Sequence, residues 1–317
     1  MPIVSEPVHV RAPATSANLG PGFDALGLAL AHYDDVTVRV SPAGVRVEVT
    51  GEGAGELPSD GNHLVVRAIR AALAALRAEV PGLVLSCHNR IPQARGLGSS
   101  SAAIVAGLLA GRALVVDGAS RLPDSEVLRL AARLEGHPDN VAPCLLGGFT
   151  IAWTSAGGGA RAVRLAPAPG VRPVVFVPDQ RGLTAEARAA LPATVPHADA
   201  AHSAARAALL VHALAAAPEL LYEATEDRLH QRYRAAGAPA TAALVDELRA
   251  SGVPAVVSGA GPSVLALATG EWTPPVPAGW AVLRPNPDTR GATVTIGSTS
   301  GTVEHAERDP VAAGGAR

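Results

Sequence analysis

The sequence predicts an α+β protein with two domains. Its 317 residues are more than one compact hydrophobic core usually organises. Hydrophobic residues make up 48% of the chain and charged residues 17%, a balance typical of folded globular proteins. In the C-terminal half, a strand is followed by helical segments and then by several strands, an order that suits an antiparallel sheet covered by helices. We expect domains over residues 1–165 and 166–305, followed by a flexible tail over 306–317.

Strands open the N-terminal half, where apolar and polar residues alternate at 8–12, 36–40 and 45–51. Residues 13–30 contain many Pro, Gly, Ser and Asn residues, which predicts an ordered loop between the first two strands. Apolar residues then recur at helical spacing. The further elements expected in this half are helices over 62–79, 100–114 and 124–135, strands over 83–91 and 149–153, and a loop over 136–148.

The C-terminal half begins with a strand over 171–178 that is bounded by prolines. Helical patterns follow, and then several short strands. Such an order fits a ferredoxin-like antiparallel sheet covered by helices. The expected helices cover residues 198–216, 219–235 and 239–250, and the expected strands cover 255–259, 263–268, 280–284 and 292–296.

Composition excludes several classes of function. All 26 basic residues are arginine, so a Walker A loop, a lysine Schiff base and a protein-kinase strand lysine are excluded. A net charge of −2 with 3% aromatic residues gives no support for nucleic-acid binding. The N-terminus lacks a leader pattern, and the longest apolar run is shorter than the roughly 20 residues that cross a bilayer. We therefore expect a cytoplasmic protein without membrane contact, whose Cys87 and Cys144 are free thiols.

The stretch QARGLGSSSAA, residues 93–103, has the composition of an anion-binding loop. Its two glycines allow the backbone to turn N–H groups inward, and a helix that begins at the serines adds the positive end of its dipole. Such a site favours a triphosphate, and a serine hydroxyl there can bind Mg²⁺. The alternative is a glycine-capped turn whose serines only cap the helix. A dinucleotide-binding loop is unlike this pattern, because it would need glycine at position 101, which is Ser101.

Acidic and polar side chains follow at the end of the helix expected over 124–135. Glu135 there faces the negative end of the helix dipole, which costs about 0.3–1 kcal/mol unless a cation such as Mg²⁺ offsets it. An exposed glutamate without function is the alternative. His137, Asp139 and Asn140 come next, and such a group can order a hydroxyl nucleophile or take its proton. The same residues also occur in ordinary turns.

Two further glycine-rich segments are candidate parts of a site. Asn18 and Asp24 share the stretch SANLGPGFD, where a carboxylate could hold an ammonium group or simply stabilise a turn. Residues 258–262 form another glycine-rich turn, at which bare backbone can approach a ligand or the first loop.

Together these motifs resemble those of the homoserine kinases, a group within the GHMP kinase superfamily. The resemblance covers residues 8 to about 300 and rests on PATSANLGPGFDALGLAL, ARGLGSSSAA, EGHPDNVAPCLLGG and SGAGPSVLAL in that order. It implies the two-domain GHMP kinase fold, with an N-terminal ribosomal-S5-domain-2-like α/β domain and a C-terminal ferredoxin-like domain. It also implies ATP-dependent phosphorylation of the side-chain hydroxyl of L-homoserine to O-phospho-L-homoserine, a step of threonine biosynthesis.

The resemblance also implies which residues bind ATP. The loop wraps the phosphates, and Ser100, with Ser99 as the less favoured choice, shares Mg²⁺ with Glu135. The expected nucleotide-binding residues are Pro92, Arg95, Gly96, Leu97, Gly98, Ser99, Ser100 and Ser101.

The resemblance also bears on the oligomeric state, for which a homodimer is the family-based expectation.

For the amino acid, the resemblance implies contacts from Asn18 and Asp24, with Asp24 at the ammonium or the reacting hydroxyl. Thr184, Arg188 and Arg234 match the family's threonine and two arginines. Two guanidinium groups can clamp one carboxylate, each contact contributing roughly 1.5–3 kcal/mol.

The resemblance places His137 in the substrate pocket and Asn140 at the reacting hydroxyl, and Asp139 would serve as a base or would organise the site. Two rivals stay open at this point. One is a GHMP kinase that acts on shikimate, mevalonate or a sugar, and the other is an inactive relative that senses a metabolite.

Overall fold

A computed structural model describes residues 2–297 of the chain and contains two sheets. The first sheet has seven strands in the order β11-β1-β2-β4-β3, and β5 pairs with both β2 and β6. The pairing of β3 with β4 is parallel, and the other pairings of this sheet are antiparallel. Its strands are β1 Val8–Ala17, β2 Leu26–Ser41, β3 Gly44–Gly51, β4 Gly82–Asn89, β5 Phe149–Thr154, β6 Ala160–Leu165 and β11 Thr293–Ile296.

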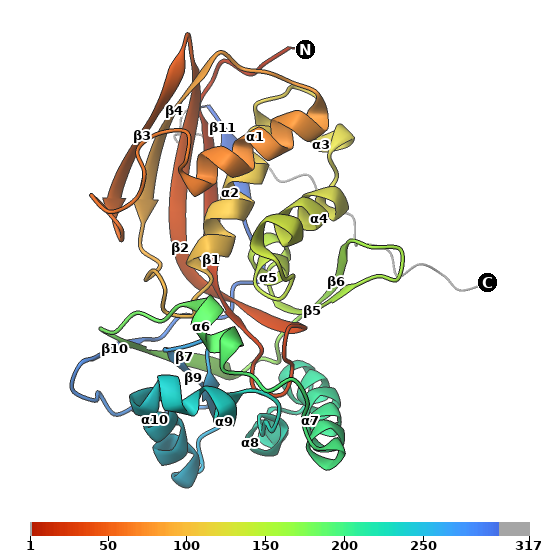
Figure 1. Cartoon of the computed structure of the whole chain (residues 1–317), viewed down its shortest axis with the longest axis vertical. Helices are drawn as coiled ribbons and strands as arrows, with labels where there is room; N and C mark the ends of the chain where they lie inside the picture. The colour runs from red at the N-terminus through yellow and green to blue at the C-terminus, as the bar shows by residue number, and fades with distance from the viewer. Residues whose placement is uncertain (1, 298–317) are drawn as a thin grey trace.

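Helices pack on one face of this sheet (Figure 1). Helix α2 is apolar on all sides because it lies between the sheet and helices α1, α4 and α5. Gly107 lets α1 pack closely, since a Cβ there would lie 2.5 Å from the carbonyl oxygen of Val65. The helices of this half are α1 Leu64–Leu76, α2 Ser99–Ala113, α3 Gly118–Arg121, α4 Asp124–Glu135 and α5 Val141–Leu146.

The second sheet is antiparallel, in the order β10-β7-β9-β8, and lies in the lower half of Figure 1. Helix α10 covers it by packing Leu244 and Leu248 into a core that includes Phe176. Its strands are β7 Val171–Pro178, β8 Ala255–Val257, β9 Val264–Thr269 and β10 Trp280–Leu283. The helices are α6 Thr184–Ala189, α7 His197–Ala215, α8 Leu221–Ala224, α9 Gln231–Arg234 and α10 Pro239–Ala250, with 3-10 turns η1 Pro218–Leu220 and η2 Ala235–Gly237.

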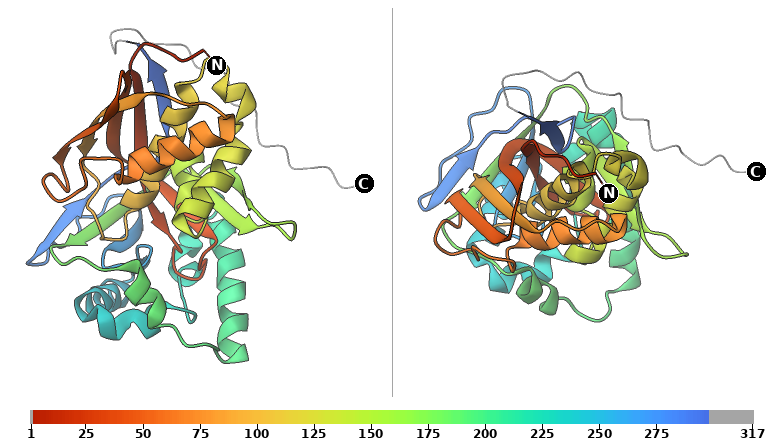
Figure 2. Two further views of the ribbon diagram at one scale, coloured as in Figure 1. Left: turned by 45° about the horizontal axis from the view of Figure 1, so that its top comes forward. Right: turned by 90° about the horizontal axis from the view of Figure 1, so that it is seen from above.

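Some expectations for the N-terminal half were wrong in detail. Strand β1 continues to Ala17 and β2 already begins at Leu26, so the loop covers residues 18–25 instead of 13–30. Pro13 lies where the β1–β2 register shifts, a place where proline is tolerated in a strand. The expected loop over 136–148 contains helix α5. Strand β6 was not predicted, and it forms with β5 a hairpin that projects from the body of the molecule (Figure 2).

In the C-terminal half, the strand expected over 292–296 exists as β11, but it pairs with β1 of the first sheet. The helix expected over 219–235 is instead divided into η1, α8 and α9, and helix α6 was not predicted. The chain passes from the first sheet to the second between β6 and β7, and the division near residue 165 stays our proposal. The tail predicted over 306–317 lies outside the described residues.

The interior is aliphatic, as composition predicts, and consists mainly of Ala, Val and Leu side chains. Cys87 and Cys144 are free and buried. Burial raises the pKa of the Cys87 thiol to about 12, so this thiol stays protonated near neutral pH. Within residues 2–297, the helices are too short or too polar to cross a membrane.

Candidate active site

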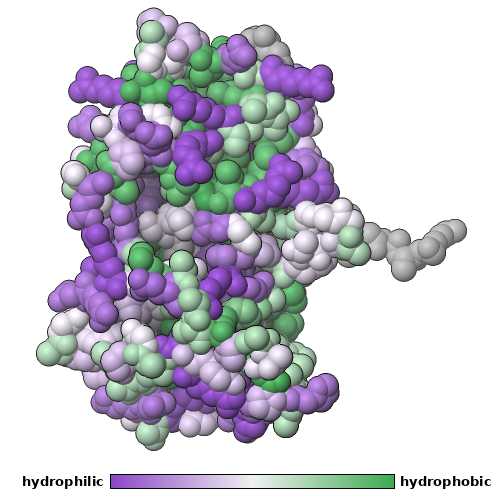
Figure 3. All heavy atoms as spheres, viewed as in Figure 1, coloured by the Kyte–Doolittle hydropathy of each residue, from purple (hydrophilic) through white to green (hydrophobic). Residues whose placement is uncertain are grey.

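The glycine-rich loop after β4 lines a pocket of about 440 Å³. Loop residues 18–25, the start of α1 and helix α6 also contribute to its wall, so both halves of the molecule form it. On the face shown in Figure 3, the surface is hollowed between the two halves, and pale residues of intermediate hydropathy lie there. The sequence motifs that were singled out therefore converge on one pocket.

The start of α2 presents free backbone N–H groups to this pocket. Gly98 is the N-cap residue with φ 68°, and no side chain caps the helix. The first N–H groups of a helix have no partner within it, and the helix dipole makes this end positive. Gly96 and Gly98 cannot be replaced without strain. A Cβ on Gly96 would lie 2.2 Å from the carbonyl oxygen of Ser258, and a Cβ on Gly98 would lie 2.0 Å from Oγ1 of Thr15.

Arg95 ties this loop to the second half of the molecule. Its Nε donates to the carbonyl oxygen of Pro178 at 2.8 Å, and its Nη2 donates to that of Asp179 at 2.8 Å. The Ser258 hydroxyl donates to the carbonyl oxygen of Gly96 at 2.7 Å. The turn at residues 258–262 thus approaches the glycine-rich loop after β4, in agreement with the expectation that it comes close to a glycine-rich loop. Backbone carbonyl oxygens accept the hydrogen bonds of the Arg95 guanidinium, so this side chain holds the loop in place.

Glu135 lies next to the serines at the start of α2. Its Oε1 accepts hydrogen bonds from Ser100 Oγ at 2.6 Å and from Ser101 Oγ at 3.0 Å. Hydroxyl and carboxylate oxygens are ligands that Mg²⁺ prefers. Among residues 2–297, no group of three or more His, Cys, Asp or Glu side chains could hold a metal ion. The serine hydroxyls and the Glu135 carboxylate could together hold an ion that also takes ligands from phosphate and water.

The HPDN motif forms the turn between α4 and α5 and lines the same pocket. His137 Nδ1 and Asp139 Oδ1 are 2.6 Å apart, and Asp139 is 2% exposed. The hydrogen bond to Asp139 raises the pKa of His137, although burial opposes this effect. Asn140 is the N-cap residue of α5, and its Oδ1 accepts a hydrogen bond from Thr15 Oγ1 at 2.7 Å. Thr15 thereby fixes the orientation of the Asn140 amide.

Asp24 and Arg188 form a bidentate ion pair, with Nη1 to Oδ2 at 2.9 Å and Nη2 to Oδ1 at 2.7 Å. Both side chains are about one third exposed. Asn18 supports Asp24, because its Oδ1 accepts from the backbone N–H of Asp24 at 2.9 Å and its Nδ2 donates to the carbonyl oxygen of Gly259 at 2.8 Å. Asn18, Leu19 and Asp24 all have φ in the left-handed region, a strain typical of functional loops.

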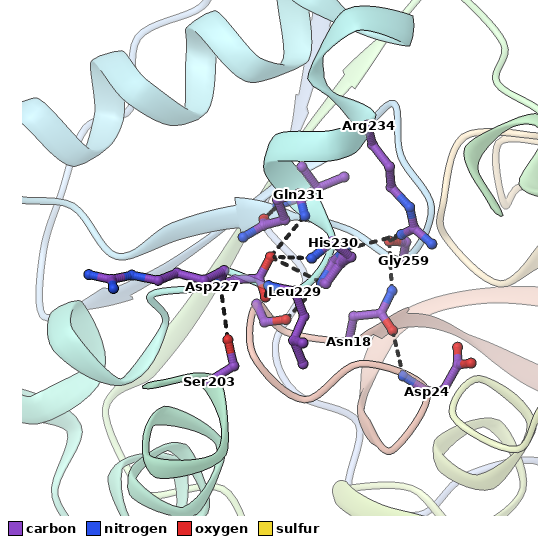
Figure 4. Close-up of polar contacts among 12 residues, drawn as sticks. Asn18, Asp24, Ser203, Asp227, Leu229, His230, Gln231, Arg234 and Gly259 are labelled. Atoms are coloured by element: carbon purple, nitrogen blue, oxygen red, sulfur yellow. Dashed lines mark hydrogen bonds and ion pairs between the residues drawn. The ribbon is translucent and has the colours of Figure 1, made fainter. Parts of the chain in front are cut away.

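Arg234 is 7% exposed, and Figure 4 shows it near Asn18 and Gly259. The guanidinium carbons of Arg188 and Arg234 lie 5.6 Å and 5.3 Å from the centre of the Phe23 ring. Burial and, after it, the positive charge of the neighbouring Arg188 lower the pKa of Arg234. Thr184 begins helix α6, four residues before Arg188, and also lines the pocket. The structure therefore brings the predicted substrate residues together.

His63 was not predicted from the sequence, and it lies in the wall of the pocket and is 3% exposed. Its Nδ1 accepts from the backbone N–H of Val65 at 3.3 Å and so caps helix α1. Since Nδ1 accepts, the hydrogen is on Nε2, and this atom has no partner among the described residues. Burial lowers the pKa of His63, which keeps the ring neutral. The Nε2 nitrogen is itself buried, with almost no surface open to the pocket.

Family models match both halves of the chain. The model of the GHMP kinases N terminal domain matches residues 63–148, and that of the GHMP kinases C terminal domain matches residues 205–273. The first match includes the glycine-rich loop, Glu135 and the HPDN motif. The second includes Arg234 and the turn at residues 258–262. Segments in both halves of the chain therefore match models of the GHMP kinases.

Several relatives of this chain are named homoserine kinase. Homoserine kinase from Streptomyces avermitilis is 57% identical over 291 residues, which cover 90% of this chain and 95% of that protein. Homoserine kinase from Clavibacter michiganensis is 56% identical over 261 residues and 82% of each chain. The crystal structure of homoserine kinase from Cytophaga hutchinsonii superposes with a TM-score of 0.77 at 26% identity, covering 92% of this chain and 98% of that one. This chain belongs to the homoserine kinases of the GHMP kinase family.

Proposed function

We propose that this protein transfers the γ-phosphoryl group of ATP to the side-chain hydroxyl of L-homoserine and thus supplies O-phospho-L-homoserine for threonine biosynthesis. One observation carries the proposal: a cradle for phosphate and a set of charges that matches an α-amino acid share a single pocket. The printed names of relatives that cover most of the chain support the same substrate.

The residues of the pocket fit ATP. Main-chain N–H groups at the start of α2 and the positive end of its dipole can hold the phosphates. Ser100, Ser101 and Glu135 would hold Mg²⁺, which when bound neutralises phosphate charge during transfer.

The amino-acid end of the pocket fits a zwitterion. Asp24 carries one negative charge, whereas Arg188 and Arg234 carry two positive charges. An incoming ammonium group can replace Arg188 at Asp24, and the incoming carboxylate can bind the two guanidinium groups. After this exchange, Asp24 pairs with the ammonium group, and Arg188 and Arg234 pair with the carboxylate. Shikimate, mevalonate and sugars lack the ammonium group and would leave Asp24 or an arginine without its new partner.

The catalytic contribution of the chain is mainly positioning. Asn140, held by Thr15, would orient the reacting hydroxyl towards the phosphate cradle. Asp139 is already engaged by His137 at 2.6 Å, which supports a role in organising the site, and its carboxylate, which lines the pocket, could accept the hydroxyl proton. Phosphoryl transfer through a loose transition state needs little help from a base.

The direct test is ADP release with Mg-ATP and a panel of L-homoserine, D-homoserine, shikimate, mevalonate and galactose. We expect turnover of L-homoserine, with a kcat/KM at least a hundredfold above that of every other compound. The stereochemical control matters because the proposed contacts fix three substituents of the α-carbon: the ammonium at Asp24, the carboxylate at the two arginines and the hydroxyl-bearing side chain at Asn140. Turnover of mevalonate or galactose at a comparable rate would refute the proposed substrate.

A further inference from the structure

His230 is a buried histidine that connects the two halves of the molecule (Figure 4). It immediately precedes α9, and its side chain has no exposed surface. Its Nε2 lies 2.8 Å from the carbonyl oxygen of Gly20, in the same loop as Asn18 and Asp24. Its Nδ1 lies 3.2 Å from Nη1 of Arg234.

These two contacts determine the protonation state of His230. The carbonyl oxygen of Gly20 can only accept, so Nε2 carries the hydrogen. The guanidinium of Arg234 can only donate, so Nδ1 carries a lone pair. The ring is therefore the neutral tautomer with hydrogen on Nε2. Burial lowers its pKa, which is consistent with this state.

The surroundings of His230 hold it in one orientation. Asp227, from the segment between α8 and α9, lies 3.7 Å from Nε2 and accepts from the backbone N–H groups of Leu229, His230 and Gln231 at 2.8, 3.1 and 2.8 Å. The ring of Phe23 lies 5.1 Å from that of His230, centre to centre. The charged groups that face His230 are Asp227, Arg234 from α9 and Asp24 from the loop over residues 18–25.

Arg234 is held at two of its three nitrogen atoms. Its Nε donates to the carbonyl oxygen of Ala187 at 3.1 Å. Its Nη1 donates to His230 and, at 3.4 Å, to the carbonyl oxygen of Gly259. Its Nη2 has no hydrogen-bond partner within residues 2–297, and the side chain lines the pocket. One nitrogen of Arg234 is thus left to bind a ligand.

We propose that His230 is a positioning residue for the phosphorylation reaction. By accepting a hydrogen bond from Nη1, it turns Arg234 so that Nη2 faces the carboxylate of the amino acid. The inference rests on the proposed function, which assigns that carboxylate to Arg188 and Arg234. A proton on Nδ1 would replace the acceptor by a donor and place two cations side by side, so His230 performs this role only as a neutral ring.

Two substitutions separate the two hydrogen bonds of His230. His230→Asn keeps an oxygen close to the position of Nδ1 and loses the donor to Gly20, whereas His230→Gln keeps the donor and loses the acceptor for Arg234. We expect the KM for L-homoserine to rise about tenfold in His230→Gln and by less than about threefold in His230→Asn, since a hydrogen bond to a charged group is lost only in the first. The KM for ATP should stay unchanged in both. An equal rise in both variants, or no rise in His230→Gln, would overturn the role.

Arg234→Ala distinguishes failure of the inference from failure of the proposed function. If Arg234→Ala raises the homoserine KM and His230→Gln does not, the function stands and the role of His230 is wrong. If Arg234→Ala has no effect, the carboxylate clamp itself is wrong, and the role of His230 falls with it. A neutron structure of the wild-type protein gives a further test that needs no folded variant. We expect deuterium on Nε2 of His230, and deuterium on Nδ1 would contradict the inference.

Discussion

Arg188 donates two hydrogen bonds to the carboxylate of Asp24, so the two residues that we assign to opposite ends of the amino acid are bound to each other in the structure. The hydrogen bond to Asp24 raises the pKa of Arg188. On the proposed assignment, homoserine enters an existing ion pair, and its affinity depends on how well its own two charges replace that pair.

Arg188→Ala should raise the KM for L-homoserine at least tenfold, because one of the two cations for the carboxylate is lost and Asp24 is left unpaired before binding. Steady-state kinetics with either substrate varied would measure the effect, and the KM for ATP should stay within about twofold. Arg181→Ala is the matched control, since Arg181 is a nearby exposed arginine that pairs with Glu56. Similar effects of both substitutions would show that net charge, and not the clamp, governs binding.

Gly98→Ala should abolish most ATP binding, because the new Cβ would lie 2.0 Å from Thr15 Oγ1 and would disturb the start of α2. Gly55→Ala has the same backbone strain, with φ 78°, but no atom lies within 4 Å of its Cβ. Calorimetric titration with ATP should therefore separate the two variants by at least tenfold in affinity, with thermal melting as the check on folding. Equal affinities would mean that the shape of the cradle does not matter.

Glu135→Gln should lower kcat/KM by roughly a hundredfold, a size typical of losing one preorganised electrostatic contact, and should raise the Mg²⁺ concentration needed for half-maximal rate. Rates measured over a range of Mg²⁺ at saturating ATP test this expectation. Glu126→Gln, on the same helix, serves as the control because Glu126 pairs with Arg129 instead. An unchanged Mg²⁺ requirement in Glu135→Gln would remove Glu135 from the metal site.

The His137–Asp139 pair predicts a pH dependence of stability. Because the hydrogen bond to Asp139 raises the pKa of His137 above 6.5, its contribution is complete below about pH 6.5 and is lost as pH rises through the raised pKa. Urea unfolding at pH 6 and pH 8.5 should therefore show a larger difference between wild type and His137→Asn at the lower pH. The opposite order would mean that His137 is held as a neutral ring.

The parts of the fold that sequence could predict are those fixed by local pattern. Periodicity located α1, α4, α7 and α10 to within a few residues, and Gly96, Gly98 and the serines marked the start of α2 correctly. Strand β11 was placed in the wrong sheet because its partner, β1, lies almost three hundred residues away, and pattern carries no information on such pairing. Strand β6 was missed because it is short and follows a run of glycines.

In the site, too, only the residues that belong to a recognisable local pattern could be predicted from the sequence. Glycines and acidic residues at helix ends pointed to the phosphate cradle and to Glu135 from local chemistry, whereas Arg188 and Arg234 stood out among 26 arginines only through the family resemblance. His63, Thr15 and His230 were not predicted. A single histidine or threonine gives no signal until the fold shows that its ring nitrogen or hydroxyl is buried and what it faces.

The most direct test of the account is a crystal structure of the protein with a non-hydrolysable ATP analogue, Mg²⁺ and L-homoserine. We expect the phosphates against the backbone N–H groups of residues 98–101, Mg²⁺ within about 2.1 Å of a Glu135 carboxylate oxygen, and the Asp24–Arg188 pair opened by the amino acid. Phosphates bound away from the start of α2, or an Asp24–Arg188 pair still closed with homoserine bound elsewhere, would contradict it.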